Sequence, residues 1–286
     1  MSRIRRRPSL ACCAFCLVKS SLVCPAAQMD KRQIGASFGR AAERYDTAAA
    51  LQRRIGDRLL ERLPKSGDEP FTILEVGAGT GFCTARLAAI GARVIALDLA
   101  EPMLRQLRRT VSTPVLSLCG DAESLPLRGN SVDMIFSNLT LQWCLDLDVL
   151  FSGFQRVLKP GGSVLYSSFG SDTLKELRSA WAQVDDASHV NLFFDQTTVQ
   201  RAMHRARLSE PAVESELLQV RYSSVLQLMR ELKGLGAHNV TLGRPRGLTG
   251  RNKLQRVVGA YERMMPRGIV AATFEVLYGM ARKNGQ

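Results

Sequence analysis

The chain has 286 residues, of which 45% are hydrophobic, and a formal net charge of +13 with a pI near 9.9. This length fits one large domain, or one domain with a sizeable insertion, and the composition is that of a globular protein with a real core. No apolar stretch approaches the length needed to span a membrane, and the basic charge favours an acidic protein, a nucleic acid or an anionic surface as the partner.

Residues 1–28 differ in kind from the rest of the chain. They contain five basic residues and no acid, together with four of the seven cysteines. A secretory signal, a mitochondrial transit peptide and an upstream extension before a true start at Met29 are all open explanations. Lys19 interrupts the apolar middle of a signal, and Met29 directly precedes a polar helical pattern, so we expect a disordered extension or leader here.

The later cysteines, Cys83, Cys119 and Cys144, have neither metal-ligand spacing nor an evident pairing. We therefore expect buried thiols in a reducing compartment, hence a cytoplasmic protein without a metal site.

Residues 31–63 have a helix-friendly composition that ends at Pro64, and we expect residues 29–66 to form helices that close a ligand site. Residues 71–76 then form an apolar strand that leads into three alternating glycines, Gly77, Gly79 and Gly81. A dinucleotide fingerprint needs a small residue three places after the second glycine, but Phe82 stands there. The loop therefore suits a ligand without phosphates that lies against bare backbone, such as S-adenosylmethionine.

Polar residues follow the next apolar runs. Asp98 follows the run at 94–97, and its carboxylate could accept hydrogen bonds from the hydroxyls of a ribose. Asp121 follows the run at 116–119 and could accept a hydrogen bond from an adenine amino group. Asn138 ends the run at 132–138. Open α/β sheets bind their ligands at the carboxyl ends of the parallel strands, where these three residues are expected to lie. Taken alone, Asp121 could equally be a turn residue or a helix cap.

The order of the elements predicts an α/β fold: a seven-stranded, mostly parallel sheet with helices on both faces. Strands are expected near 71–76, 93–98, 115–119, 132–137, 163–169, 212–222 and 274–281, and helices near 82–90, 102–110, 145–157, 173–184 and 195–207. Residues 159–162 are predicted to form a turn into the fifth strand. Residues 67–283 would be one domain, in which residues 223–272 form a helical cap inserted between the last two strands.

The glycine loop and the strand tips resemble the Rossmann-like class I S-adenosylmethionine-dependent methyltransferases. Several longer segments resemble a narrower family, the malonyl-[acyl-carrier protein] O-methyltransferases of biotin synthesis; they are residues 38–42, 45–46, 51–52, 137–144, 167–174, 233–239, 246–251 and 274–279. The resemblance covers about residues 30–283. It fails at 195–199, where the family pattern leads us to expect an Asp-Met-His-type segment.

The resemblance implies that the chain methylates the free carboxylate of a malonyl thioester on an acyl carrier protein. It implies cofactor contacts from Tyr45, Gln52, Glu75, Gly77, Gly79, Gly81, Asp98, Leu99, Met103, Asp121, Ala122 and Asn138. It also implies substrate positioning by Tyr45, His238, Asn239 and Arg246, and we expect Arg244, Arg246, Arg251, Lys253 and Arg256 to dock the acidic carrier protein.

The chemistry implied needs no general base, because a malonyl carboxylate is already ionised at neutral pH. His238 is therefore a positioning residue or an ordinary loop histidine. A small-molecule methyltransferase acting on a quinone precursor, an assembly factor of mitochondrial complex I that modifies an arginine, and a nucleic-acid methyltransferase are alternatives. No basic-aromatic interleaving supports the last of these.

Overall fold

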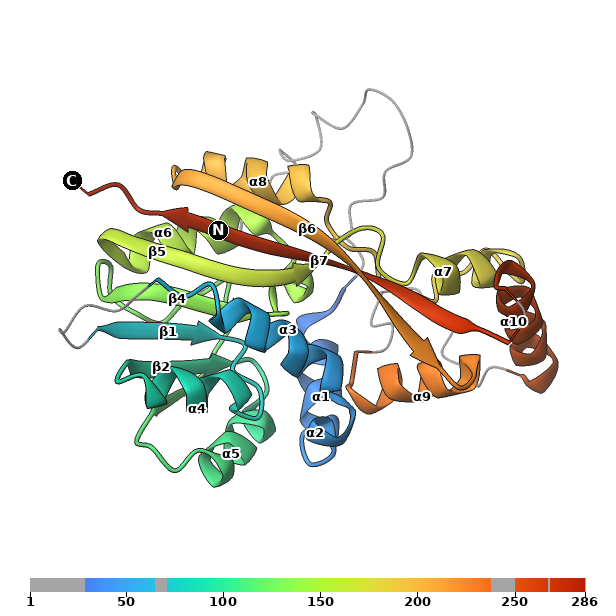
Figure 1. The fold of residues 1–286 in the computed structure, drawn as a ribbon. Helices are drawn as coiled ribbons and strands as arrows, with labels where there is room; N and C mark the ends of the chain where they lie inside the picture. The colour runs from blue at the N-terminus through green and yellow to red at the C-terminus, as the bar shows by residue number, and fades with distance from the viewer. Residues whose placement is uncertain (1–28, 65–70, 238–249, 267, 286) are drawn as a thin grey trace, which may run out of the picture.

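The computed structural model describes residues 29–64, 71–237, 250–266 and 268–285. Within these ranges the chain forms one seven-stranded sheet with helices on both faces (Figure 1). The strands are β1 (Thr72–Val76), β2 (Arg93–Asp98), β3 (Leu116–Cys119), β4 (Val132–Asn138), β5 (Leu158–Phe169), β6 (Ser209–Tyr222) and β7 (Val270–Arg282). Their order across the sheet is β3-β2-β1-β4-β5-β7-β6. β7 runs antiparallel to both β5 and β6, and the other neighbouring strands pair in parallel. The expected fold class is confirmed.

The helices before and along the first strands are α1 (Lys31–Ala41), α2 (Tyr45–Ala48), α3 (Ala50–Leu60), α4 (Phe82–Ala89) and α5 (Glu101–Thr110). The single helical stretch expected at 31–63 is thus three helices. The chain turns after Ala41 and again near Ala49, which lets α1 lie across the end of the sheet (Figure 1).

The central strands bury side chains on both faces, as a parallel sheet covered by helices requires. On one face Ile73, Phe136 and Leu165 pack with residues of α3 and α4. On the other face Leu74 and Ile135 pack with residues of α6 (Leu147–Val157) and α8 (Gln196–Arg205). The alternation along β1 from Ile73 to Leu74 follows the two-residue period of a strand.

The fifth strand begins earlier than the turn residues at 159–162 predict. Its pairing with β4 starts at Leu158, and the backbone of Gly161 and Gly162 hydrogen-bonds with Lys283, just beyond β7, at 3.0 and 2.8 Å. Gly161 has a φ of 79°, so the glycines bend the chain without ending the strand. The expected turn is therefore a bend within β5.

The insertion between the last two strands contains α9 (Val225–Gly234) and α10 (Arg251–Met264). With α7 (Lys175–Ala182) these helices gather beyond the carboxyl ends of the parallel strands (Figure 1). The chain leaves the sheet at Tyr222 and returns at Val270, and these two residues are paired with each other across β6 and β7. Ser37 of α1 donates a hydrogen bond to the carbonyl of Gly236, at 2.9 Å, so the end of α9 rests on α1.

Candidate active site

Three glycines shape the turn between β1 and α4, and each has a positive φ: 74° at Gly77, 57° at Gly79 and 96° at Gly81. These values favour glycine because a Cβ atom is strained in this region. A Cβ on Gly77 would lie 1.9 Å from the Thr140 Oγ1 atom, whereas a Cβ on Gly79 would meet no atom within 4 Å. Gly77 thus permits close packing, and Gly79 leaves backbone open beside a cavity.

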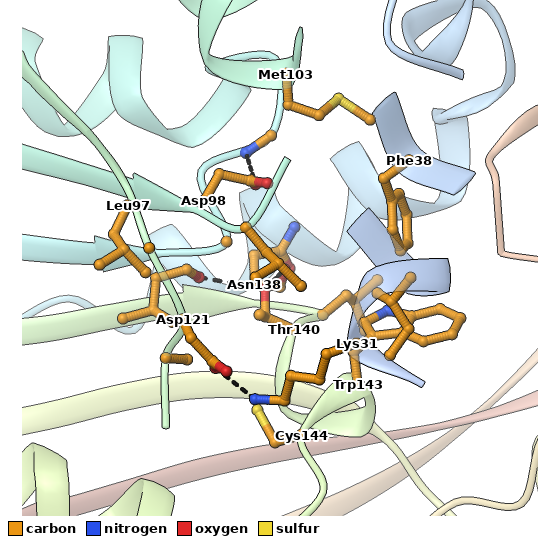
Figure 2. Close-up of a pocket in the computed structure, with 18 of the residues that line it drawn as sticks. Lys31, Phe38, Leu97, Asp98, Met103, Asp121, Asn138, Thr140, Trp143 and Cys144 are labelled. Atoms are coloured by element: carbon orange, nitrogen blue, oxygen red, sulfur yellow. Dashed lines mark hydrogen bonds and ion pairs between the residues drawn. The ribbon is translucent and has the colours of Figure 1, made fainter. Parts of the chain in front are cut away.

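That cavity lies at the carboxyl ends of the parallel strands (Figure 2). Most of the side chains and glycines expected at a cofactor site line it: Tyr45, Gly77, Gly79, Asp98, Leu99, Met103, Asp121, Ala122 and Asn138. Gly81 lines neither this cavity nor the one beside it, and a Cβ on Gly81 would meet Leu107 and Val111. Its role in the structure is to let α5 approach the loop.

Asp98 is fixed at the tip of β2 by backbone donors. The amides of Gly79 and Ala100 donate to its two carboxylate oxygens at 2.9 and 2.8 Å. Burial raises the pKa of Asp98, against the opposing effect of these hydrogen bonds. The result is an oriented carboxylate in the cavity wall, which suits a ligand that offers hydroxyl donors.

Asp121 follows β3 and also faces the cavity, where Lys31 of α1 lies against it (Figure 2). The Lys31 ammonium forms ion pairs with both Asp121 and Glu123. The carboxylate expected to meet an adenine amino group is therefore also part of a three-residue ionic cluster.

A second cavity continues behind the glycine loop and is lined by Gln52 and Glu75, the remaining two expected cofactor residues. Glu75 is 2% exposed, and the Thr84 hydroxyl donates to it at 2.5 Å. Burial raises the pKa of Glu75 to about 8. This carboxyl group can accept a cationic ligand by releasing a proton, so the cavity suits an ammonium group.

Asn138 and Tyr45 lie at the junction of the two cavities, since both line each of them. The Asn138 amide donates to the carbonyl of Gln52 at 3.1 Å and accepts from the Ser167 hydroxyl at 2.8 Å. Burial and the nearby carboxylates of Asp98 and Asp46 raise the pKa of the Tyr45 phenol. Tyr45 is consequently a neutral hydrogen-bonding group at physiological pH and not a base.

The sequence reasoning missed several residues of the cavity wall: Lys31, Ile34, Phe38, Thr140, Trp143 and Cys144. Phe38 and Trp143 pack edge to face, with ring centroids 5.2 Å apart. Phe38 and Trp143 stand in segments that carry the family resemblance, and that is the one signal that could have pointed to them. Among the described residues no cluster of acids, histidines and cysteines could hold a metal ion.

A third cavity adjoins the first two, sharing Trp143 with one and Gln52 with the other. Its walls are mostly apolar and come from α3, from α9, from the segments before α7 and α8, and from β5, β6 and β7. They include Phe169, Leu174, Phe193, Leu235 and Phe274. It therefore places an apolar space beside α9 and next to the second cavity, at Gln52.

The residues expected to bind substrate and carrier protein fall into two groups. His238, Asn239, Arg244 and Arg246 lie outside the described residues. Arg251 and Arg256 are exposed on α10, but Lys253 is half-buried and forms an ion pair with Asp185. Lys253 therefore contributes less free charge to a basic surface than the sequence suggests.

In the part of the chain that the structure describes, no helix combines the length and apolar character needed to cross a bilayer.

An adenosyl ligand that carries a sulfonium charge and ends in an amino acid fits the residues present. Gly79 leaves room for it against the backbone, Asp98 and Asp121 offer acceptors, and Glu75 lies in the adjoining cavity. Lys31, the one lysine among the described residues that line the first cavity, is already paired with two carboxylates. The lining is thus suited to a ligand with positive charge.

Comparisons with known proteins agree with this geometry. Residues 74–166 match the family described as "Methyltransferase domain". A putative methyltransferase from Bacillus halodurans C-125 shares the fold with a TM-score of 0.59 at 16% identity, covering 80% of this chain and 98% of that one. At this identity the likeness supports the fold alone.

Curated relatives are much closer in sequence. The malonyl-[acyl-carrier protein] O-methyltransferase of Methylococcus capsulatus is 45% identical over 89% of this chain and 94% of its own length. That of Laribacter hongkongensis is 42% identical over 88% of this chain and 89% of its own length. The biotin biosynthesis bifunctional protein BioHC of Cellvibrio japonicus is 44% identical, and the match spans 50% of that longer protein. With this identity over nearly its whole length, the chain belongs to the malonyl-[acyl-carrier protein] O-methyltransferase family.

Proposed function

We propose that the chain transfers a methyl group from S-adenosylmethionine to the free carboxylate of malonyl-acyl carrier protein, giving the malonyl methyl ester, an early step of biotin synthesis. The observation that carries the proposal is the 42–45% identity to enzymes of that name across about nine-tenths of both chains. The quinone-precursor, complex I and nucleic-acid alternatives have no comparable support.

The described residues supply what binding of the cofactor needs. The open backbone at Gly79 and the fixed carboxylate of Asp98 would hold the adenosyl sugar, and Asp121 would meet the adenine. Glu75 and Gln52 would surround the amino-acid end. When bound, the cofactor supplies an activated methyl group on a sulfonium centre.

The protein's part in the reaction is to align the reactants and to exclude water. A malonyl carboxylate has a pKa well below 7 and attacks without help from a base. Opposite charges are cancelled as the methyl group is transferred, so a dry pocket favours the reaction. Phe38 and Trp143 supply apolar walls, while Tyr45 and Asn138 offer neutral hydrogen bonds for alignment.

The substrate side remains a proposal. His238, Asn239 and Arg246 would position the malonyl group, and Arg244, Arg246, Arg251, Lys253 and Arg256 would orient an acidic carrier protein. The exposure of Arg251 and Arg256 on α10 supports the docking role. A cytoplasmic location belongs to the same proposal. Cys83 and Cys144 are buried free thiols, which supports a reducing compartment, whereas Cys119 is exposed, contrary to the expectation that all three are buried.

Mass spectrometry tests the proposal directly. Malonyl-loaded acyl carrier protein is incubated with the purified chain and S-adenosylmethionine, and the carrier protein is then weighed intact. A gain of one methyl group by the malonyl-loaded carrier protein, with no gain by carrier protein that lacks the malonyl group, supports the proposal. An unchanged carrier protein, with methylation of a quinone precursor in a parallel reaction, would replace it with the small-molecule alternative.

A further inference from the structure

The ionic cluster beside the first cavity joins three separate segments of the chain. Lys31 is the first residue of α1, and its ammonium forms an ion pair with Asp121 in the loop after β3 (Figure 2). It forms a second ion pair with Glu123 of the same loop. Glu123 in turn accepts hydrogen bonds from the amides of Leu145 and Asp146, at 3.0 and 2.7 Å. The lysine therefore links α1, the 121–123 turn and the segment that precedes α6.

All three segments contribute walls to the cavity. From α1 come Ile34 and Phe38, from the turn Asp121 and Ala122, and from the segment before α6 Trp143 and Cys144. Fixing these segments relative to one another thus fixes the shape of this end of the cavity.

The cluster is sheltered, which makes it stronger than an ordinary surface pair. The side chains of Lys31 and Glu123 are 19% and 10% exposed, and that of Asp121 is 33% exposed. Removing the cation would leave two carboxylates close together with little water to screen them. Asp121 would then turn away from Glu123, and this change alters what it offers to a ligand.

We infer that Lys31 is a positioning residue of the cofactor site, which holds the Asp121 carboxylate toward the adenine end and α1 against the cavity. The inference rests on the proposed function, since it assumes an adenosyl ligand. Lys31 acts through Asp121 and takes no part in the methyl transfer itself.

The test compares Lys31→Met and Lys31→Arg with the wild type, and uses Lys175→Met as the matched control. Lys175 pairs with Asp172 at 3.0 Å, both side chains are about half exposed, and neither lines the cavity. Calorimetry measures the dissociation constants of S-adenosylhomocysteine and of 5′-methylthioadenosine, which keeps the adenine but lacks the amino-acid end. Steady-state kinetics measures kcat and both KM values.

Loss of one hydrogen bond to a charged group corresponds to about a tenfold weaker affinity, so Lys31→Met should raise both dissociation constants by about that factor. The KM for the cofactor should rise likewise, with kcat and the KM for the carrier-bound substrate within about twofold of wild type. Lys31→Arg should recover most of the loss, and Lys175→Met should bind as the wild type does. In an Asp121→Asn background the same lysine substitution should have a much smaller effect.

Two results would overturn the inference. One is a Lys31→Met protein with a lowered melting temperature but unchanged dissociation constants, which would make the cluster purely structural. The other is an equal loss in the presence and absence of Asp121. If the wild-type protein binds neither ligand, the proposed function fails first, and that outcome is distinguished by the wild-type titration alone.

Discussion

The buried acid Glu75 makes a sharp prediction about stability and pH. Glu75 is 2% exposed, and its carboxyl group accepts a hydrogen bond from the Thr84 hydroxyl at 2.5 Å. Burial raises its pKa from 4.5 to about 8. The folded protein therefore keeps a proton on Glu75 in a pH range where the unfolded chain has lost it.

The sign and size of the effect follow from proton linkage. The folded state is favoured most below the unfolded pKa of 4.5, and this advantage is lost as the pH rises toward the folded pKa of about 8. At about 1.4 kcal/mol per pH unit, the difference between the two pKa values corresponds to about 5 kcal/mol. Glutamine keeps the shape of the neutral acid and can accept the Thr84 hydrogen bond, but it cannot ionise.

The assay is urea unfolding of the wild type and of Glu75→Gln, without ligand, at about pH 5 and about pH 8.5. The free energy of unfolding of the variant, relative to that of the wild type, should be about 4 kcal/mol greater at the higher pH. Asp98 also has a raised pKa, but it is present in both proteins and cancels in the comparison. A stability difference that stays constant between the two pH values would contradict this prediction, since it would mean that Glu75 ionises normally in the folded protein.

Two further predictions concern the glycine loop and the insertion. Gly79→Ala should fold at a cost of about 1–2 kcal/mol for its positive φ, yet bind S-adenosylhomocysteine at least about tenfold more weakly, because the new methyl group enters the cavity. Gly77→Ala should instead lower the melting temperature strongly, because its Cβ collides with Thr140. Calorimetry measures the loss of ligand affinity, and thermal melts measure the loss of stability. If both variants lost affinity and stability equally, the different roles given to Gly77 and Gly79 would be wrong. Replacing Arg251 and Arg256 with Glu should raise the KM for carrier-bound substrate several-fold and leave the affinity for the cofactor unchanged. As a control, Arg128→Glu reverses a charge near the amino end of β4 and should change neither that KM nor the affinity for the cofactor. A KM that does not respond to the α10 reversal would remove these two arginines from docking.

Much of the sheet could be predicted because its signals are local. Continuous apolar runs followed by Asp98, Asp121 or Asn138 mark buried parallel strands and their carboxyl ends, and the structure brings these three side chains to one cavity. The positive φ at each of the three glycines likewise agrees with their spacing in the sequence. Their contact with a cofactor stays a prediction.

What the sequence did not reveal depends on contacts between distant segments. Lys31 is ninety positions from Asp121, and no helical or strand period indicates that α1 crosses the sheet there. The early start of β5 has the same origin, since Gly162 pairs with Lys283 from the other end of the chain. Lys253 looks like a free charge in the sequence and is paired only because Asp185 folds against α10.

The pairing of Tyr222 with Val270 has a consequence for how such enzymes diversify. The two ends of this segment meet at paired positions of one β-ladder. The segment can therefore be lengthened, shortened or exchanged while the sheet that binds the methyl donor stays intact. The docking role proposed for α10 therefore predicts that transplanting the α9–α10 excursion between homologues changes the acceptor while binding of the methyl donor is kept.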